Sequence, residues 1–230
     1  VAGALNINAL KLVPTAVAAG RAVLLESQKE NGVAVVEMGA ATTSVAIFVE
    51  GFLQYFGVIN IGANHITNDI AISLAVSTEV AEEIKMKYVT AELIDNDKPM
   101  TMRFGDESIS FTKTMVNQIV EDRLIDIFEH VKKEIAIAGY EKKLPEGVVL
   151  TGGGAEMRGI ERFAREHMEV ATRIGLPLMD VTHIDNETKK PRFAVAIGLA
   201  LMMNDDMREQ ETRVEEKPVG FLSKLFGGGR

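Results

Sequence analysis

The sequence predicts an α/β protein in which a mixed sheet is flanked by helices and interrupted by an inserted α+β subdomain. Three segments rich in β-branched residues follow one another within 33–59, as in an antiparallel meander. A further strand-like segment, "VVLT", runs directly into glycines and then an amphipathic helix. The stretch between these two regions has mainly helical periodicity.

The first part of the chain is expected to alternate helix and strand. The segment "ALKLVPT" is typical of a short strand that leads into a small-residue helix from Thr15 to Gln28. Glu50 and Gly51 are typical of a turn between two strands. The three strands of the meander are predicted at 33–38, 44–49 and 52–59.

The middle of the chain is predicted to form two short amphipathic helices, a hairpin and a long helix. The long helix runs from about Lys113 to Ala138 because its apolar residues recur at helical spacing, and Gly139 suits the position just after its end. Ser77 or Thr78 can cap the second short helix. The expected order is 61–76, 79–89, 99–111 and 113–138.

The last third repeats the order of strand, glycine cluster and helix in "GVVLTGGGAEMRGIERFAREHM", followed by the short strand "ATRIG". The segment "PRFAVAIGLALMM" is apolar on nearly all sides and is therefore expected to be a buried helix. Residues 205–218 are charged and are interpreted as a flexible acidic linker, before the apolar tail "GFLSKLFGGGR".

Composition excludes several classes of function. The formal net charge is −8 over 230 residues, which argues against nucleic acid as the main partner. The chain has no cysteine, so neither disulfides nor thiol catalysis are available, which fits a reducing cytoplasm. The four histidines do not have the spacing of a metal site. Because the sequence begins "VAGALN", without Met and without a leader pattern, we expect a fragment that is not secreted.

Two clusters of small residues, each placed after a buried strand, are the candidate ligand-binding segments. Phosphate groups require several converging backbone N–H donors, and a Cβ at those positions blocks their approach. The clusters "GAATT" (39–43) and "TGGG" (151–154) meet this need, although neither matches the common P-loop or dinucleotide patterns. The alternatives are a small-residue turn for the first cluster and tight strand–helix packing for the second.

The two clusters and their flanks resemble the actin and sugar-kinase superfamily of ATPases, whose core is actin-like (ribonuclease-H-like). The stretch "EMGAATT" stands where that superfamily has its second phosphate loop, and "VVLTGGGAEMRGI" is similar to its adenosine motif. The stretches "VPTAVAAGRAV" and "PRFAVAIGLAL" are similar to its two connecting helices. Through "GVINIGANHITNDIA", "AEEIKMKYV" and "ATRIGLP" the chain most resembles the FtsA family of bacterial cell-division actin homologues.

The FtsA resemblance covers the second half of a family member and implies a domain organisation. Subdomain 2A would comprise 1–62 and 149–204, with subdomain 2B inserted at 63–148. The acidic linker at 205–218 and an amphipathic membrane-targeting tail at 219–230 would follow. The subdomains that carry the first phosphate loop are absent, so this chain would supply one wall of the nucleotide cleft.

The resemblance also implies the ligands and their contacts, which are ATP and Mg²⁺. The first cluster would face the β- and γ-phosphates, and the glycines of the second would let adenosine lie against the backbone. Glu82 and Lys85 would reach the ribose or base, although a solvated helix surface is the alternative for this pair. The implied nucleotide-binding residues are Gly39, Ala40, Ala41, Thr42, Thr43, Gly152, Gly153, Gly154, Glu82 and Lys85.

Three departures from the superfamily pattern lower the expected rate of hydrolysis. Glu37 replaces the usual Asp and would hold Mg²⁺ through water, because that ion keeps several waters. Ala40 and Ala41 replace loop glycines. Val13 replaces the Glu that precedes Pro in hydrolytic relatives, and a valine cannot orient or deprotonate water. We therefore expect no catalytic residue, and nucleotide binding with little or no hydrolysis.

The resemblance implies a protein that polymerises and tethers the FtsZ ring to the cytoplasmic face of the inner membrane. Subdomain 2B would bind the FtsZ C-terminal peptide, with Lys85, Lys87 and Arg103 as candidate contacts, and copies would form a filament. Other division proteins are further potential partners. One tail would bind a bilayer marginally, whereas many tails on a filament would bind strongly. The implied lipid-binding residues are Phe221, Leu222, Lys224, Leu225 and Phe226.

Two other functions stay open at the level of sequence. A PilM-like actin homologue of type IV pilus assembly would have a similar core, but the residues after Met203 favour FtsA. An ATPase or kinase of the same superfamily is disfavoured by Val13. The tail can also dock on its own domain, although the expected linker argues against this.

Overall fold

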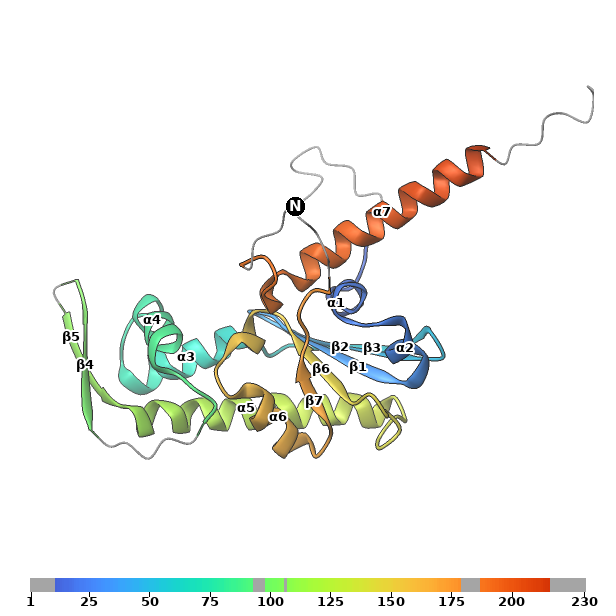
Figure 1. The fold of residues 1–230 in the computed structure, drawn as a ribbon. Coiled ribbons are helices and arrows are strands. Elements are labelled where there is room, and N and C mark those ends of the chain that lie inside the picture. Colours follow the sequence, from blue (N-terminus) through green and yellow to red (C-terminus); the bar gives the residue numbers. More distant parts are fainter. Residues whose placement is uncertain (1–10, 93–97, 106, 179–186, 216–230) are drawn as a thin grey trace, which may run out of the picture.

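A five-stranded mixed sheet forms the centre of the molecule (Figure 1). The structure is a computed structural model that describes residues 11–92, 98–105, 107–178 and 187–215. The sheet order is β3-β2-β1-β6-β7. The strands are β1 (Val33–Met38), β2 (Thr43–Val49), β3 (Phe52–Ile59), β6 (Val148–Thr151) and β7 (Thr172–Ile174).

Both antiparallel and parallel pairing occur in this sheet, as the sequence predicts. The first three strands form the expected antiparallel meander, with Val36 opposite Val45 and Val45 opposite Gly57. β6 lies parallel to β1, and β7 lies parallel to β6. All residues of β1 and β6 are buried, as expected for strands covered on both faces.

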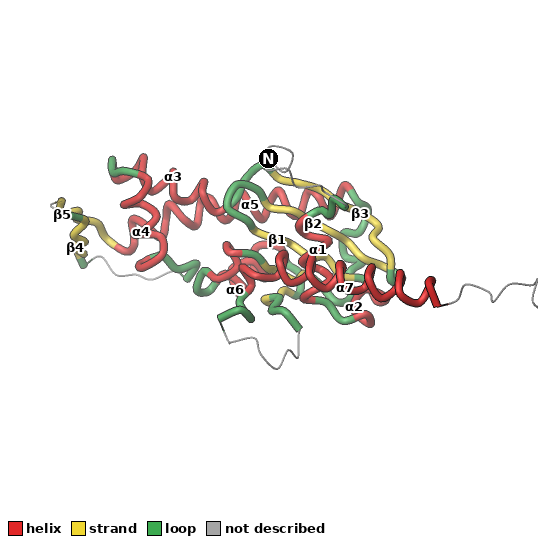
Figure 2. The backbone as a smooth tube through the Cα atoms, turned by 90° about the horizontal axis from the view of Figure 1, so that it is seen from above, coloured by secondary structure: helices red, strands yellow, loops and turns green. Residues whose placement is uncertain are grey.

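Helices cover the two faces of the sheet. One face packs against α1 and α7, which lie side by side, and the other packs against the long helix α5 and α6 (Figures 1 and 2). The two helices of the first face touch through their backbones, since a Cβ at Gly198 would lie 1.7 Å from the Ala18 carbonyl oxygen. The bounds are α1 (Thr15–Val23), α2 (Glu26–Asn31), α5 (Lys113–Ile137), α6 (Ile160–Met168) and α7 (Ala194–Glu215).

The inserted stretch extends beyond one end of the sheet (Figure 1). Its two short helices and its hairpin lie at the positions that the sequence predicts, and Ser77 caps the second helix by accepting from the N–H of Val80 (3.4 Å). Gly139 follows α5 with φ +76°, as a residue just past a helix end requires. The elements are α3 (Ala63–Leu74), α4 (Thr78–Tyr88), β4 (Pro99–Phe104) and β5 (Glu107–Thr112).

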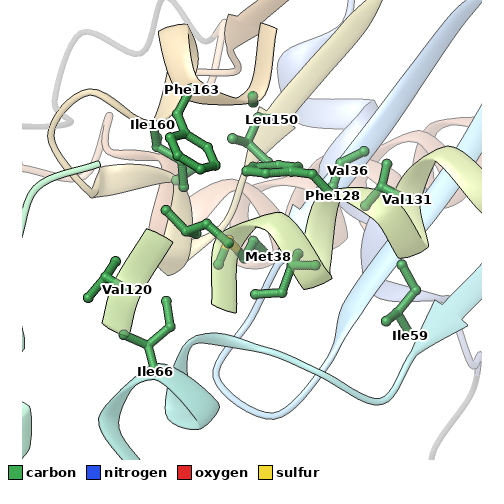
Figure 3. Close-up of a cluster of buried hydrophobic side chains, with 14 of the residues drawn as sticks. Val36, Met38, Ile59, Ile66, Val120, Phe128, Val131, Leu150, Ile160 and Phe163 are labelled. Atoms are coloured by element: carbon green, nitrogen blue, oxygen red, sulfur yellow. The ribbon is translucent and has the colours of Figure 1, made fainter. Parts of the chain in front are cut away.

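The larger hydrophobic core lies between the sheet and α5. Phe128 of α5 is fully buried and packs near Phe163 of α6, with ring centroids 6.1 Å apart (Figure 3). The same core continues into the insertion, where Ile66 and Val120 are also buried (Figure 3). One continuous core therefore ties the insertion to the sheet and fixes the walls of any cleft between them.

Three predictions that concern helices are wrong. The helix expected from Thr15 to Gln28 is divided into α1 and α2, because Leu24 and Leu25 are extended. The carbonyl groups at the end of α1 are taken by distant parts of the chain: Ala22 O accepts from the N–H of Leu178 (2.9 Å). These tertiary contacts end the helix where the local sequence contains no breaker.

The segment expected to be a flexible linker instead continues α7 as far as Glu215. Its first residues are anchored on the surface of the fold, because Asp205 pairs with Arg21 (2.9 Å) and Asp206 pairs with Lys11 (3.0 Å). Good helix formers then extend the helix without an apolar face. The predicted tail at 219–230 lies outside the described residues.

The expectation that α7 is buried on nearly all sides is also wrong. Ala194 and Ile197 are buried against the sheet, but Leu199 and Met203 are 42% and 65% exposed. Within the described ranges, no helix has both the length and the apolar character needed to cross a bilayer.

Candidate functional site

The two clusters of small residues lie next to each other at one edge of the sheet. β1 and β6 are parallel neighbours, with Glu37 opposite Thr151. The segments that leave these strands therefore emerge at the same edge, although more than a hundred residues separate them in the sequence. Gly152 shows how close they are, since a Cβ there would lie 2.6 Å from the carbonyl oxygen of Met38.

The first cluster is held so that its carbonyl groups point into the protein. Gly39 O and Ala40 O accept from the N–H groups of Ala63 (2.9 Å) and Asn64 (2.8 Å) at the start of α3. Gly62 permits this contact, because a Cβ there would lie 2.6 Å from Ala40 O.

Three consecutive N–H groups of the same cluster are free to bind a ligand. Ala40, Ala41 and Thr42 donate no backbone hydrogen bond to any group in the described part of the chain. Ala40 and Ala41 are exposed. Consecutive free N–H groups on a turn are the arrangement that binds anions such as phosphate.

The second cluster contains three glycines that have different surroundings. Gly152 has φ +87° and adjoins Met38 O, so a side chain there is excluded on two grounds. Gly154 packs on the Met38 side chain, where an added Cβ would lie 2.5 Å from Met38 Cγ. Gly153 is exposed, and a Cβ there would meet no heavy atom within 4 Å. The fold therefore accounts for two glycines and leaves the third unexplained.

A cavity of about 560 Å³ lies between the clusters and the inserted helices. This volume is in the range of small-molecule sites. Its lining includes both clusters, the exposed side of α4 and the segment before α7. The predicted residues that line it are Gly39, Ala40, Glu82, Lys85, Gly153 and Gly154. Four others lie beside it without being part of its lining: Ala41, Thr42, Thr43 and Gly152.

Thr43 differs from its prediction, because its hydroxyl group does not face the cavity. The side chain is fully buried, and Oγ1 donates to the carbonyl oxygen of Ile61 (2.8 Å). Thr43 begins β2, and its side chain lies on the face of the sheet that packs against α5. The hydroxyl therefore joins β2 to the chain after β3, and its predicted contact with phosphate is wrong.

Glu82 and Lys85 form a bonded network on α4 and are not a freely solvated pair. Lys85 Nζ pairs with Glu82 (2.7 Å) and donates to Thr67 Oγ1 (2.8 Å) and Ala63 O (3.2 Å). Burial raises the pKa of Glu82, but hydrogen bonds from Lys85 and Thr67 outweigh this and leave that pKa lowered. Only 9% of the Lys85 side chain is exposed, which makes it a poor contact for a partner peptide.

Glu37 is buried beside both clusters. It is 7% exposed, and its Oε1 would lie 2.7 Å from a Cβ at Gly152 and 3.5 Å from one at Gly39. Burial raises its pKa, and a hydrogen bond from Thr15 partly offsets the rise. In the described residues it has no ion pair, so a cation nearby would satisfy a carboxylate that the fold leaves uncompensated. These surroundings fit a Mg²⁺ ion held through water, although no group of three or more His, Asp or Glu side chains with metal-binding geometry occurs among the described residues.

An ion pair that the sequence does not predict lies in the lining of the cavity. Arg192 Nε donates to Glu156 Oε1 (2.7 Å), and this partner lowers the pKa of Glu156. Both residues line the cavity. Pro191 O also accepts from the N–H of Gly152 (3.2 Å), so the segment before α7 is attached to the glycine cluster. Neither sequence spacing nor periodicity indicates this pair, which lies 36 residues apart.

A second, more open groove of about 400 Å³ lies on the insertion, between α3 and α5. Its centre is Arg123, which contacts Asp69 with two nitrogens (2.7 and 3.0 Å) and Asp126 with a third (2.7 Å). Ile72, on its rim, is 79% exposed. The groove combines a fixed cation with exposed apolar surface, and it shares no lining residue with the first cavity.

Solved structures with the same architecture define the class to which this chain belongs. MreB5 of Spiroplasma citri bound to ADP superposes with a TM-score of 0.71 at 17% identity, covering 91% of this chain and 64% of that one. The PilM–PilN type IV pilus biogenesis complex gives a TM-score of 0.65 at 20% identity, covering 85% and 53%. The sheet, its flanking helices and the insertion are therefore those of an actin-like fold.

Sequence comparison identifies the family within this class. The family model described as "Cell division protein FtsA" matches residues 34–198. The FtsA of Pseudomonas aeruginosa (strain PAO1) is 34% identical over 188 residues, which are 80% of this chain and 45% of that protein. The FtsA of Neisseria meningitidis (strain MC58) is 34% identical over 220 residues, or 92% and 51%. The chain belongs to the FtsA family of cell division proteins, and it spans about half the length of the curated relatives it matches.

Proposed function

We propose that this chain supplies one wall of an ATP-binding cleft in an actin-like cell division protein. The observation that carries the proposal is the convergence of two clusters at the ends of the parallel strands β1 and β6, next to a cavity of about 560 Å³. The N–H groups of Ala40, Ala41 and Thr42 receive the phosphates. The bare backbone at Gly153 and the network of Glu82 and Lys85 receive the nucleoside.

Mg²⁺ would be held near Glu37, where it supplies positive charge beside the phosphates. The carboxylate acts through water, because it is nearly buried and lies behind the backbone of Gly39 and Gly152. Val13 provides no base, so the chain binds nucleotide and turns it over slowly or not at all.

Calorimetric titration with ATP and Mg²⁺ tests this proposal. It compares the 230-residue chain with a version extended by the N-terminal half of a curated relative. The extended protein should bind ATP at least tenfold more tightly, because the second wall contributes further contacts. Equal affinities would show that the cleft assignment is wrong. Phosphate release at about 1 s⁻¹ or faster, an ordinary enzyme rate, would favour an ATPase or kinase instead.

We further propose that the protein links the FtsZ ring to the cytoplasmic face of the inner membrane, as a filament. The FtsZ C-terminal peptide would bind the insertion at 63–148 (subdomain 2B), where exposed Ile72 lies at the groove between α3 and α5. The sequence at 219–230 would bind lipid. Lys87 and Arg103 are the other two candidate contacts for the peptide. Lys87 pairs with Glu83, and Arg103 is exposed.

Sedimentation with anionic liposomes distinguishes this function from that of a PilM-like protein. The full chain should sediment with vesicles, and a variant that lacks residues 219–230 should stay in the supernatant. If both variants sediment equally, the tail is not the membrane anchor.

A further inference from the structure

The sheet has one long edge that no described element covers. β3 pairs with β2 on one side and has no described strand on the other. It runs along the outside of the sheet in Figure 2, where α1 and α7 lie over other strands. In an edge strand of an antiparallel pair, alternate N–H and C=O groups point outward without partners and can bind another strand.

β3 lacks two of the features that usually protect an edge strand, although a bulge interrupts its pairing with β2 between Ile47 and Phe48. None of its eight residues, FLQYFGVI, is charged, and none is proline. The β4–β5 hairpin of the same molecule differs, because it contains Pro99, Arg103 and Glu107. The one long strand at an edge of the main sheet therefore carries no charge.

Large apolar side chains flank this edge. Phe52 is 72% exposed, and Leu53, Phe56 and Val58 are 44%, 36% and 48% exposed. Phe56 lies opposite Ala46 of β2, and Val58 lies opposite Ser44. They are on the face of the sheet where α1 packs against the inner strands β1 and β2. The helix thus leaves the outer part of that face open.

We propose that β3 is an association edge, at which a second copy of this chain adds its own β3 in antiparallel orientation. Two five-stranded sheets then join through a two-fold axis, which is the closed symmetry of most homodimers. A second copy fits the edge because the chain carries a net charge of −8 and copies repel over most of their surface, whereas eight uncharged residues meet without repulsion. The exposed apolar side chains of one β3 are also complementary to those of another.

This association is independent of the nucleotide site. No residue of β3 lines the 560 Å³ cavity or the groove around Arg123. The dimer should therefore form with or without ATP, and loss of ATP binding would leave it unchanged.

Sedimentation velocity at protein concentrations from about 1 to 200 µM tests the proposal. The wild-type chain should shift from monomer to dimer as its concentration rises. Phe56→Lys should shift the midpoint at least tenfold higher, since it places a charge on the edge without disturbing the core. The matched control is Thr101→Lys on β4, which adds the same charge at another exposed strand position and should associate like the wild type. A wild-type chain that stays monomeric, or a Phe56→Lys variant that dimerises normally, overturns the proposal.

Hydrogen exchange separates strand pairing from other modes of association. In the monomer, the N–H groups of β3 that point outward exchange quickly, and in the dimer about every second amide of Phe52–Ile59 should become protected. Circular dichroism of both variants verifies that they fold. If the wild type dimerises while the exchange of these amides does not change, β3 is not the contact and the proposal is wrong.

Discussion

Gly153 and Gly154 are neighbours in the sequence, yet the structure predicts opposite results when each is replaced by alanine. A Cβ at Gly154 would lie 2.5 Å from Cγ and 2.7 Å from Sδ of Met38, far inside van der Waals contact. Met38 is fully buried, so its side chain has no space into which it can move. A Cβ at Gly153 would meet nothing within 4 Å, and the residue has no positive φ that would strain an alanine.

The expected magnitudes follow from these surroundings. Overpacking a core by one methyl group costs about 1–3 kcal/mol, so Gly154→Ala should lower the melting temperature by about 2–12 °C in a chain of this size. Gly153→Ala should leave the melting temperature unchanged or raise it, because alanine restricts the unfolded chain by about 0.4–1 kcal/mol. The methyl group at 153 projects toward the cavity, where it would keep a nucleoside away from the backbone. ATP affinity should therefore fall about tenfold, or about 1.4 kcal/mol.

Thermal unfolding and calorimetric titration with Mg·ATP measure the two effects separately. The expected pattern is a stable Gly153→Ala variant that binds ATP weakly and a Gly154→Ala variant that melts early. If Gly153→Ala binds ATP as the wild type does, the open side of this glycine does not face the ligand, and the nucleotide interpretation of the second cluster is wrong. A Gly154→Ala variant with normal melting would show that Met38 is not fixed as described.

Three other changes test separate parts of the structure. Burial raises the folded-state pKa of Glu37, so its contribution to stability is present below pH 4.5 and is lost as pH rises through the raised pKa. Glu37→Gln should therefore raise the melting temperature at pH 7 but not at pH 4. A larger rise in melting temperature at pH 4 than at pH 7 would contradict this. Gly198→Ala should destabilise the fold by about 3 kcal/mol or more in urea unfolding, since its Cβ would overlap Ala18 O at 1.7 Å; normal stability would exclude the α1–α7 contact. Arg192→Gln should cost only about 0.2–1 kcal/mol, because the side chain is 46% exposed, and a larger loss would show that the pair with Glu156 is a structural anchor.

Local patterns were sufficient to predict most elements of this fold. The meander follows from β-branched residues between turn signals, and α5 follows from a sustained apolar stripe that ends at Gly139. The break between α1 and α2 could not be predicted, since it depends on Leu178, which lies more than 150 residues away and bonds to the end of α1. A helix end that is set by a distant partner leaves no local signal.

The sequence indicates the two small-residue clusters of the candidate site, but it does not indicate contacts that depend on how distant segments pack together. Two small-residue clusters after buried strands indicate a phosphate-binding edge, and the parallel pairing of β1 and β6 puts both clusters there. The pairing of Glu156 with Arg192 depends only on how the segment before α7 returns to the sheet, so no pattern in the sequence predicts it.

The three glycines of the second cluster explain why the sequence "TGGG" fits both nucleotide binding and tight strand–helix packing. Gly152 is required by its positive φ and by Met38 O, and Gly154 is required by the Met38 side chain, so for these two residues the packing interpretation is sufficient. Gly153 has neither constraint, and a Cβ at this position in the short 3-10 helix Gly153–Glu156 would fit the fold. A residue that the fold leaves free and that faces a cavity is where a ligand imposes the choice of side chain. The nucleotide interpretation of "TGGG" therefore rests on one glycine of three, and only structural context separates that glycine from its neighbours.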